Sequence, residues 1–193
     1  MNAVTPSVAQ ATLQGLRDIV GAAHVIVDAD TMAPYLVEER GLYRGAARAI
    51  VRPGSTQEVS RVLAYCNSNG VKIVPQGGNT GLVGGQVPSL AGDEIVLSLR
   101  RMDRIREIDA TANILVVDAG VTLMRAQEEA DKVDRLFPLS LPSEGSCTIG
   151  GNLSTNAGGV AAVAYGVARD LVMGIEVVLA DGRVMSNLTR VKK

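Results

Sequence analysis

Two glycine-rich stretches carry the clearest chemical signal in the sequence. The first runs Pro75-Gln-Gly-Gly-Asn-Thr-Gly-Leu-Val-Gly-Gly85, and the second runs Gly145-Ser-Cys-Thr-Ile-Gly-Gly-Asn-Leu-Ser-Thr-Asn-Ala-Gly-Gly159. Each holds five of the chain's 21 glycines. Glycine permits positive φ and lets a ligand approach the main chain, and successive N–H groups in such loops form a concave site for phosphate oxygens. The two stretches therefore predict a bound anion.

The other residues of the two loops narrow the kind of anion. Neither loop contains lysine or arginine, and both supply neutral donors, namely Asn79, Thr80, Ser146, Thr148, Ser154 and Thr155. Neutral donors suit a resident diphosphate better than a transferring γ-phosphate. The sequence contains no G-x-x-x-x-G-K-S/T, G-x-G-x-x-G or G-x-S-x-G motif. Two glycine-rich connections without any ligand are the alternative interpretation.

The elements before the first loop form a strand–helix–strand unit. Ala49 to Val51 reads as a short strand, and Ser55 with Glu58 forms a capping box before a helix that stops at Asn69-Gly70. Val71 to Val74 reads as the next strand. This pattern predicts a parallel strand pair with a right-handed crossover. The first glycine loop then leaves the carboxyl end of a parallel strand, where α/β folds bind ligands.

The rest of the chain reads as mixed α+β. We expect a first helix capped by Thr5, irregular structure over 24–46, strands over 94–99, 105–108 and 114–119, and a helix capped by Thr122. The second glycine loop could open a short helix at Ile149, and 175–180 with 183–185 form a hairpin. A soft boundary near Ser89-Leu90 divides the chain into an α/β part, 1–89, and a second α+β part, 90–193.

Composition excludes several classes of protein. Of the 193 residues, 47% are hydrophobic and 20% are charged, which indicates a globular protein. The formal net charge is −1, and the sequence has no basic stripe that would bind nucleic acid. No apolar run approaches the ~20 residues that span a bilayer, and the N-terminus lacks a secretory signal. Two distant cysteines and one histidine exclude a common zinc site, so we expect no metal. These features predict a cytosolic protein without a transmembrane segment.

Several single residues have ordinary structural interpretations. His24 is expected to be structural or on the surface, and Cys66 to be a core residue. Cys147 lies inside the second loop and could contact a ligand, but a small packed side chain is the favoured role. Glu144 is expected to be solvated. A solvent-exposed charged face is expected to hold four arginines, Arg100, Arg101, Arg104 and Arg106. Neighbouring acidic residues would balance their charge.

The two loops also carry a resemblance to a known family. From about Tyr35 to the C-terminus the chain resembles the FAD-binding domain of the vanillyl-alcohol oxidase and p-cresol methylhydroxylase superfamily, closest to its D-2-hydroxyglutarate and D-lactate dehydrogenases, with the glycolate oxidase flavoprotein subunit further off. The motifs are Pro75–Gly85, Pro138–Gly159, Tyr165-Gly166 and Gly174–Gly182. The resemblance implies an α+β fold of the p-cresol methylhydroxylase type, with a small βαβ subdomain, a larger α+β subdomain and FAD between them.

The resemblance also assigns roles to residues. Gln76 to Leu82 would wrap the FAD diphosphate, Ser143 to Asn156 would continue towards the flavin ring, and Ile175 to Ala180 would run near the adenine. The full set of implied cofactor-binding residues is Pro75, Gln76, Gly77, Gly78, Asn79, Thr80, Gly81, Leu82, Gly85, Ser143, Gly145, Ser146, Cys147, Thr148, Gly150, Gly151, Asn152, Thr155, Asn156, Gly158, Gly159, Tyr165 and Gly166. No catalytic residue is assigned within the chain.

Departures from the family pattern sharpen these expectations. Members with covalent flavin often place a histidine at the end of a Ser-Gly-Gly-His run, and here Gln76-Gly-Gly-Asn79 stands instead, so we expect non-covalent FAD. Glu38-Glu39 stands where family members often have Asp-Trp, and Ala164 stands where they tend to have a basic residue. Family members continue past this chain with a further FAD-binding stretch and a substrate domain. We therefore expect the 193 residues alone to lack turnover.

These features favour the FAD-binding part of a dehydrogenase that oxidises a D-2-hydroxy acid, in the D-2-hydroxyglutarate or D-lactate class, to the 2-oxo acid by hydride transfer to flavin. The implied partners are a small 2-hydroxy acid, which the missing domain would bind, and a separate electron acceptor. No nucleic acid is expected as a partner. A homodimer is possible. One alternative is another oxidoreductase of the superfamily, such as an aldonolactone oxidase or the enolpyruvyl reductase of cell-wall synthesis. The other is a non-catalytic flavin- or nucleotide-binding module.

Overall fold

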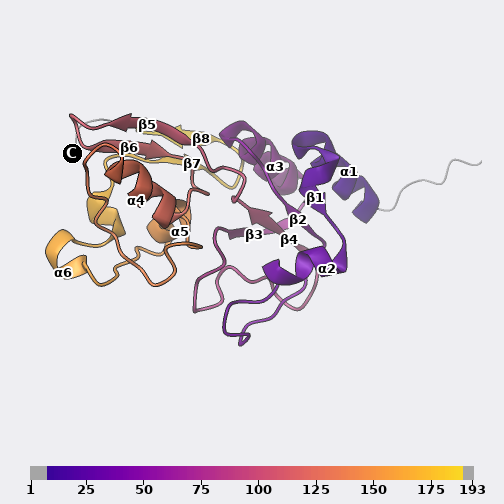
Figure 1. The fold of residues 1–193 in the computed structure, drawn as a ribbon. Coiled ribbons are helices and arrows are strands. Elements are labelled where there is room, and N and C mark those ends of the chain that lie inside the picture. The colour runs from indigo at the N-terminus through magenta and orange to yellow at the C-terminus, as the bar shows by residue number, and fades with distance from the viewer. Residues whose placement is uncertain (1–7, 189–193) are drawn as a thin grey trace, which may run out of the picture.

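A computed structural model describes residues 8–188 of the chain, and Figure 1 shows its arrangement. The first helix, α1 (Val8–Val20), was predicted to be capped by Thr5, which lies outside the described residues. A four-stranded sheet with its helices occupies one end of the ribbon, and two hairpins with the helices α4 to α6 occupy the other. The fold is thus α+β, as the sequence predicts.

The four-stranded sheet has the order β1-β2-β4-β3. Its strands are β1 (Val25–Ile26), β2 (Ala49–Val51), β3 (Lys72–Gln76) and β4 (Glu94–Ser98). Both β2 and β3 pair with β4 in parallel, while β1 pairs with β2 antiparallel. The predicted parallel pair is therefore interrupted, because β4 lies between its two members.

The position of β4 also bears on the boundary predicted near Ser89. This strand follows Ser89 in sequence yet lies in the middle of the first sheet, so by strand pairing the first part of the fold extends to Ser98. The reason is burial: Ile95 and Val96 are fully buried on opposite faces of the sheet, as expected for a central parallel strand. Sequence periodicity identified the strand but not its neighbours.

Side chains of successive strand residues point to opposite faces of the sheet, so the core has two layers. Ala49 and Val51 of β2 pack with Leu16 of α1 and Val62 of α3 (Thr56–Ser68), whereas Ile50 packs on the other face with Met32 of α2 (Ala29–Met32). The hydroxyl of Ser55 caps α3 by accepting from the Glu58 N–H at 3.2 Å, as predicted. The stretch 24–46, predicted to be irregular, contains β1, α2 and the 3-10 turns η1 (Ala22–His24) and η2 (Ala33–Tyr35).

The second part contains two antiparallel hairpins and short helices. One hairpin joins β5 (Ile105–Asp109) to β6 (Ile114–Val117), and the other joins β7 (Glu176–Val178) to β8 (Val184–Ser186). The helices are α4 (Leu123–Asp131), α5 (Ile149–Ser154) and α6 (Ala162–Tyr165), with the 3-10 turn η3 (Ala168–Leu171). A small core holds Leu123, Leu139, Cys147 and Ala168 together.

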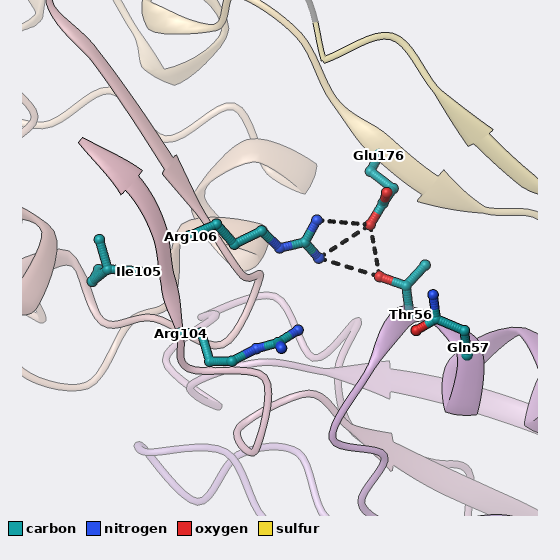
Figure 2. A pocket seen from close by; sticks show the side chains of 6 residues that line it. All are labelled: Thr56, Gln57, Arg104, Ile105, Arg106 and Glu176. Carbon is teal, nitrogen blue, oxygen red and sulfur yellow. Dashed lines mark hydrogen bonds and ion pairs between the residues drawn. The ribbon is translucent and has the colours of Figure 1, made fainter. Parts of the chain in front are cut away.

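A polar network joins the two parts (Figure 2). Arg106 of β5 pairs with the buried carboxylate of Asp118 and with Glu176 of β7, at 3.1 Å for the second pair. Glu176 in turn accepts from the hydroxyl of Thr56 at the first turn of α3, at 2.6 Å. Arg106, Glu176 and Thr56 border a cleft of about 470 Å³. The network fixes the β7–β8 hairpin against α3.

Candidate functional site

The first glycine loop leaves the carboxyl end of β3 with its main-chain donors unpaired. From Gly77 to Gly85, no backbone N–H donates a hydrogen bond to any part of the chain that the structure describes. Buried or half-buried N–H groups normally find partners in proteins, so such a run needs water or a ligand. A sequence of N–H donors around one loop is the arrangement that binds phosphate oxygens.

Two residues predicted to bind the cofactor hold the loop in shape through their side chains. The amide of Gln76 is buried and donates to the carbonyl oxygens of Tyr35 and Gln86, at 2.9 Å each. The amide of Asn79 donates to Pro34 O at 3.0 Å and Val37 O at 2.8 Å. The side-chain nitrogens of both residues are thus occupied by the protein, whereas the Oδ1 atom of Asn79 is buried without a partner among the described residues.

The sequence did not indicate that a buried carboxylate also supports the first loop. Glu38 is buried, and its carboxylate accepts from the N–H groups of Arg40 and Leu42, at 2.9 and 2.6 Å. The hydrogen bond from Arg40, together with the others, holds the pKa of Glu38 below its usual value despite burial. Arg40 then donates to the carbonyl oxygen of Leu82. The Glu-Glu pair that departs from the family pattern thus contains a buried anion that organises this segment.

The second glycine loop, in contrast, is largely folded on its own main chain. The N–H groups of Ser146 and Cys147 both donate to Ser143 O, at 2.8 and 2.7 Å. The short helix expected at Ile149 is α5, and Thr148 caps it by accepting from the Gly151 N–H at 3.4 Å. Cys147 is buried in the small core, in agreement with its favoured structural role. Several main-chain donors of this loop are therefore already paired within the protein.

The structure brings the two loops into direct contact. A Cβ atom on Gly77 would overlap the hydroxyl of Thr148, and one on Gly78 would lie 2.8 Å from the carbonyl carbon of Ser146. These two glycines are therefore required by the packing of one loop on the other. This packing role is not visible in the sequence, because the contact joins segments about 70 residues apart.

Three other loop glycines, Gly85, Gly145 and Gly151, are not explained by close packing. A Cβ atom on Gly85 would meet nothing within 4 Å, and one on Gly145 would meet only Met124, at 3.9 Å. One on Gly151 would lie 3.4 Å from the Thr148 hydroxyl, its only close neighbour. The open space at these positions and the unpaired N–H groups of the first loop fit a ligand that runs along the main chain. A diphosphate-containing cofactor meets that description.

The remaining predicted residues lie further along the chain. Gly159 and Gly166 have positive φ values of 79° and 83°, so each is required by its own backbone conformation. Tyr165 lies on α6 with 52% of its surface exposed. Among the described residues, no hydrogen bond links 158–166 to the first loop. Their predicted place in the cofactor pocket stays a prediction.

Titratable groups near the loops are few. The carboxylate of Glu144, which we expected to be solvated, lies 3.4 Å from the amide of Gln127. His24 is the last residue of η1, directly before β1, and burial, Arg101 and Arg52 lower its pKa. Among residues 8–188, no group of histidine, cysteine or acidic side chains could hold a metal ion. The site therefore contains binding groups but no evident acid–base pair.

Comparison with known proteins identifies the family. The FAD binding domain family matches residues 47–186, and the chain belongs to it. The probable mitochondrial D-2-hydroxyglutarate dehydrogenase of Oryza sativa subsp. indica is 44% identical over 177 residues, which is 92% of this chain and 31% of that protein. The mitochondrial D-2-hydroxyglutarate dehydrogenase of Bos taurus is 39% identical over 186 residues, 96% of this chain and 34% of that protein. The chain thus spans about a third of the length of these relatives.

Solved structures agree with the family. A p-cresol methylhydroxylase with substrate bound has a TM-score of 0.75 at 26% identity, covering 95% of this chain and 36% of that one. An alkyldihydroxyacetonephosphate synthase has a TM-score of 0.85 at 20% identity, covering 97% and 36%, and shows the fold alone. The predicted fold class and FAD as the cofactor are confirmed.

One prediction from the sequence is wrong. The relatives from Oryza and Bos are named as mitochondrial, which contradicts the cytosolic location inferred from composition. Composition reports the redox environment of the cysteines, and a reducing environment is not specific to the cytosol. Separately, no helix within the described residues is long and apolar enough to cross a membrane.

Proposed function

We propose that this chain is the FAD-binding part of a flavoprotein dehydrogenase that oxidises a D-2-hydroxy acid, of the D-2-hydroxyglutarate or D-lactate class, to the 2-oxo acid. The observation that carries the proposal is the 44% identity, over 92% of the chain, to a protein named as a probable D-2-hydroxyglutarate dehydrogenase. The D-lactate class is supported by a relative from Schizosaccharomyces pombe, 42% identical over 151 residues, whose name is "Putative D-lactate dehydrogenase C713.03, mitochondrial". Bound FAD supplies the hydride acceptor.

The proposed division of labour between the loops follows from their hydrogen bonding. The unpaired N–H groups from Gly77 to Gly85 bind the diphosphate, since they have no hydrogen-bond partner among the described residues. The second loop lies against Gly77 and Gly78 and provides the wall along which the rest of the cofactor extends. Its open glycines, Gly145 and Gly151, allow that close approach.

Substrate oxidation requires groups that the two loops do not supply. A base must take the hydroxyl proton, and a cation must hold the substrate carboxylate. Within the two loops, Cys147 has the one ionisable side chain, and it is buried. Glu144 directly precedes the second loop. We therefore place the catalytic residues in the part of the protein that this chain does not cover. Re-oxidation of the flavin by a separate electron acceptor belongs to the same proposal.

The test compares this chain with the protein extended through the downstream domain. Both are mixed with D-2-hydroxyglutarate, D-lactate and their L-enantiomers in the presence of an artificial electron acceptor. The proposal predicts turnover of a D-acid by the longer protein alone, while both proteins bind FAD. Substrate-dependent bleaching of the flavin by the 193-residue chain, or equal turnover of D- and L-acids by the longer one, would contradict it.

A further inference from the structure

The arginines over 100–106 do not form the single outer face that the sequence suggested. Arg101 donates to Arg52 O and lies 3.7 Å from the carboxylate of Glu58. Arg104 and Arg106 both pair with Asp118. Arg100 alone turns towards the glycine loops, where its Nη2 donates to the carbonyl oxygen of Gly78 at 3.2 Å.

Arg100 lies where the two glycine loops meet. It lines a crevice of about 350 Å³ whose other walls include Gly145, Ser146 and Thr148 of the second loop. It also contacts Gly78 of the first loop, the residue that packs against Ser146. Its guanidinium therefore borders both loops at once, although the residue belongs to neither.

The charge of Arg100 is not neutralised by the protein. Among the described residues, no carboxylate lies within 4.0 Å of its guanidinium. Arg40 also touches the first loop, but it lies 3.6 Å from the buried Glu38 carboxylate. Arg125 lines the same crevice, but it lies 3.6 Å from Asp103. At the junction of the loops, Arg100 thus carries the uncompensated positive charge.

We propose that Arg100 binds the FAD diphosphate and makes the site selective for FAD over flavins that lack a diphosphate. The inference rests on the proposed cofactor placement and adds the cation that the loops themselves do not contain. The diphosphate brings two negative charges to loops whose own donors are neutral. A guanidinium has five N–H donors in a fixed fork, so one can hold Gly78 O while others reach a phosphate oxygen.

The experiment titrates the cofactor-free chain with FAD, riboflavin and ADP at several salt concentrations, following flavin fluorescence and, for ADP, competition with FAD. The variants are Arg100→Gln and Arg100→Lys. Arg61→Gln is the matched control, because Arg61 is also exposed and donates to a carbonyl oxygen, Ile19 O at 3.4 Å, but lies on α3 away from the loops.

Arg100→Gln is expected to weaken FAD and ADP binding at least about tenfold, the size of a charge-assisted hydrogen bond, and to reduce the salt dependence of FAD affinity. Riboflavin affinity and the Arg61→Gln control should match the wild type, and Arg100→Lys should retain part of the FAD affinity. The inference is overturned if Arg100→Gln binds FAD like the control. It is also overturned if FAD and riboflavin weaken equally, because Arg100 would then act only through the shape of the loop. A wild-type chain that binds no flavin would instead refute the cofactor placement, and this inference with it.

Discussion

Gly78 and Ser146, which belong to different loops, are packed main chain against main chain. A Cβ atom at position 78 would lie 2.8 Å from the Ser146 carbonyl carbon and closer still to its oxygen. The two glycine loops are therefore one structural unit. A substitution at Gly78 tests the contact between the loops before it tests any ligand, whereas Gly145 borders the crevice without close neighbours.

We expect Gly78→Ala to destabilise the fold by about 1–3 kcal/mol, because backbone of one loop must move to admit the methyl group. Gly145→Val should leave the stability within about 0.5 kcal/mol, as for an exposed position without special features. It should nevertheless weaken FAD binding, because the new side chain enters the crevice. Thermal unfolding and a flavin titration of both variants measure the two effects.

The opposite pattern would refute this assignment. If Gly78→Ala kept wild-type stability, the loops would not be packed as described. If Gly145→Val bound FAD with wild-type affinity, the crevice beside the second loop would not be part of the cofactor site.

The sequence predicted most elements of the fold but not how they assemble. The strands around Ile50, Ile73 and Val96 were found from apolar runs and turn residues. Their order was not, because the pairing of β4 with both β2 and β3 depends on contacts between distant segments. Short elements such as β1 and α2 were missed, since two to four residues are too few to show a period.

The buried amide of Gln76 offers a second test. It donates to two carbonyl oxygens, Tyr35 O and Gln86 O, and so fixes both ends of the first loop. Gln76→Glu keeps the shape but replaces the donor with an acceptor that faces two acceptors. We expect a loss of about 2–4 kcal/mol at neutral pH, the cost of leaving buried polar groups without partners.

Chemical denaturation at pH 7 and pH 5 measures this loss. It should shrink at the lower pH, because a protonated carboxyl regains one donor. A Gln76→Glu protein with wild-type stability at pH 7 would show that the amide does not hold the loop.

Asp118 gives a prediction about acid stability. Burial alone would raise the pKa of this carboxyl, but hydrogen bonds from Arg104 and Arg106 outweigh it and hold the pKa below its usual value. A carboxyl with a depressed folded pKa stabilises the fold above the unfolded value and loses that contribution as the pH falls through the folded value. The pairing therefore contributes in full at neutral pH and is lost below about pH 4.

Asp118→Asn should cost about 3 kcal/mol at pH 7, since Arg106 loses a buried partner, and should flatten the fall in stability between pH 4 and pH 2. Urea unfolding across this range measures both changes. Equal pH dependence in the variant and the wild type would show that other carboxyl groups, and not Asp118, control acid unfolding.

The mode of flavin attachment gives a further prediction. Asn79 stands where covalent family members often have histidine, and its amide is occupied by Pro34 O and Val37 O. We expect FAD to be held without a covalent bond. Acid precipitation of the flavin-loaded protein should release the yellow colour into the supernatant, and colour retained in the pellet would contradict the expectation.

The candidate site was predictable in part. The glycine content and the resemblance located both loops. The roles within them were not predictable, because a sequence does not show that the side chains of Gln76 and Asn79 face inward. Nor does it show that Arg100, outside both loops, reaches Gly78. Such roles depend on which backbone groups the rest of the fold leaves unpaired.

Amide hydrogen exchange over residues 77–85, measured with and without FAD, tests the central claim most directly. These N–H groups have no partner in the described protein, so they should exchange rapidly in the free chain. Saturating FAD should slow their exchange at least about tenfold, while the already paired amides of β2 and β4 change little. Tight FAD binding that leaves exchange over 77–85 unchanged would show that the cofactor lies elsewhere.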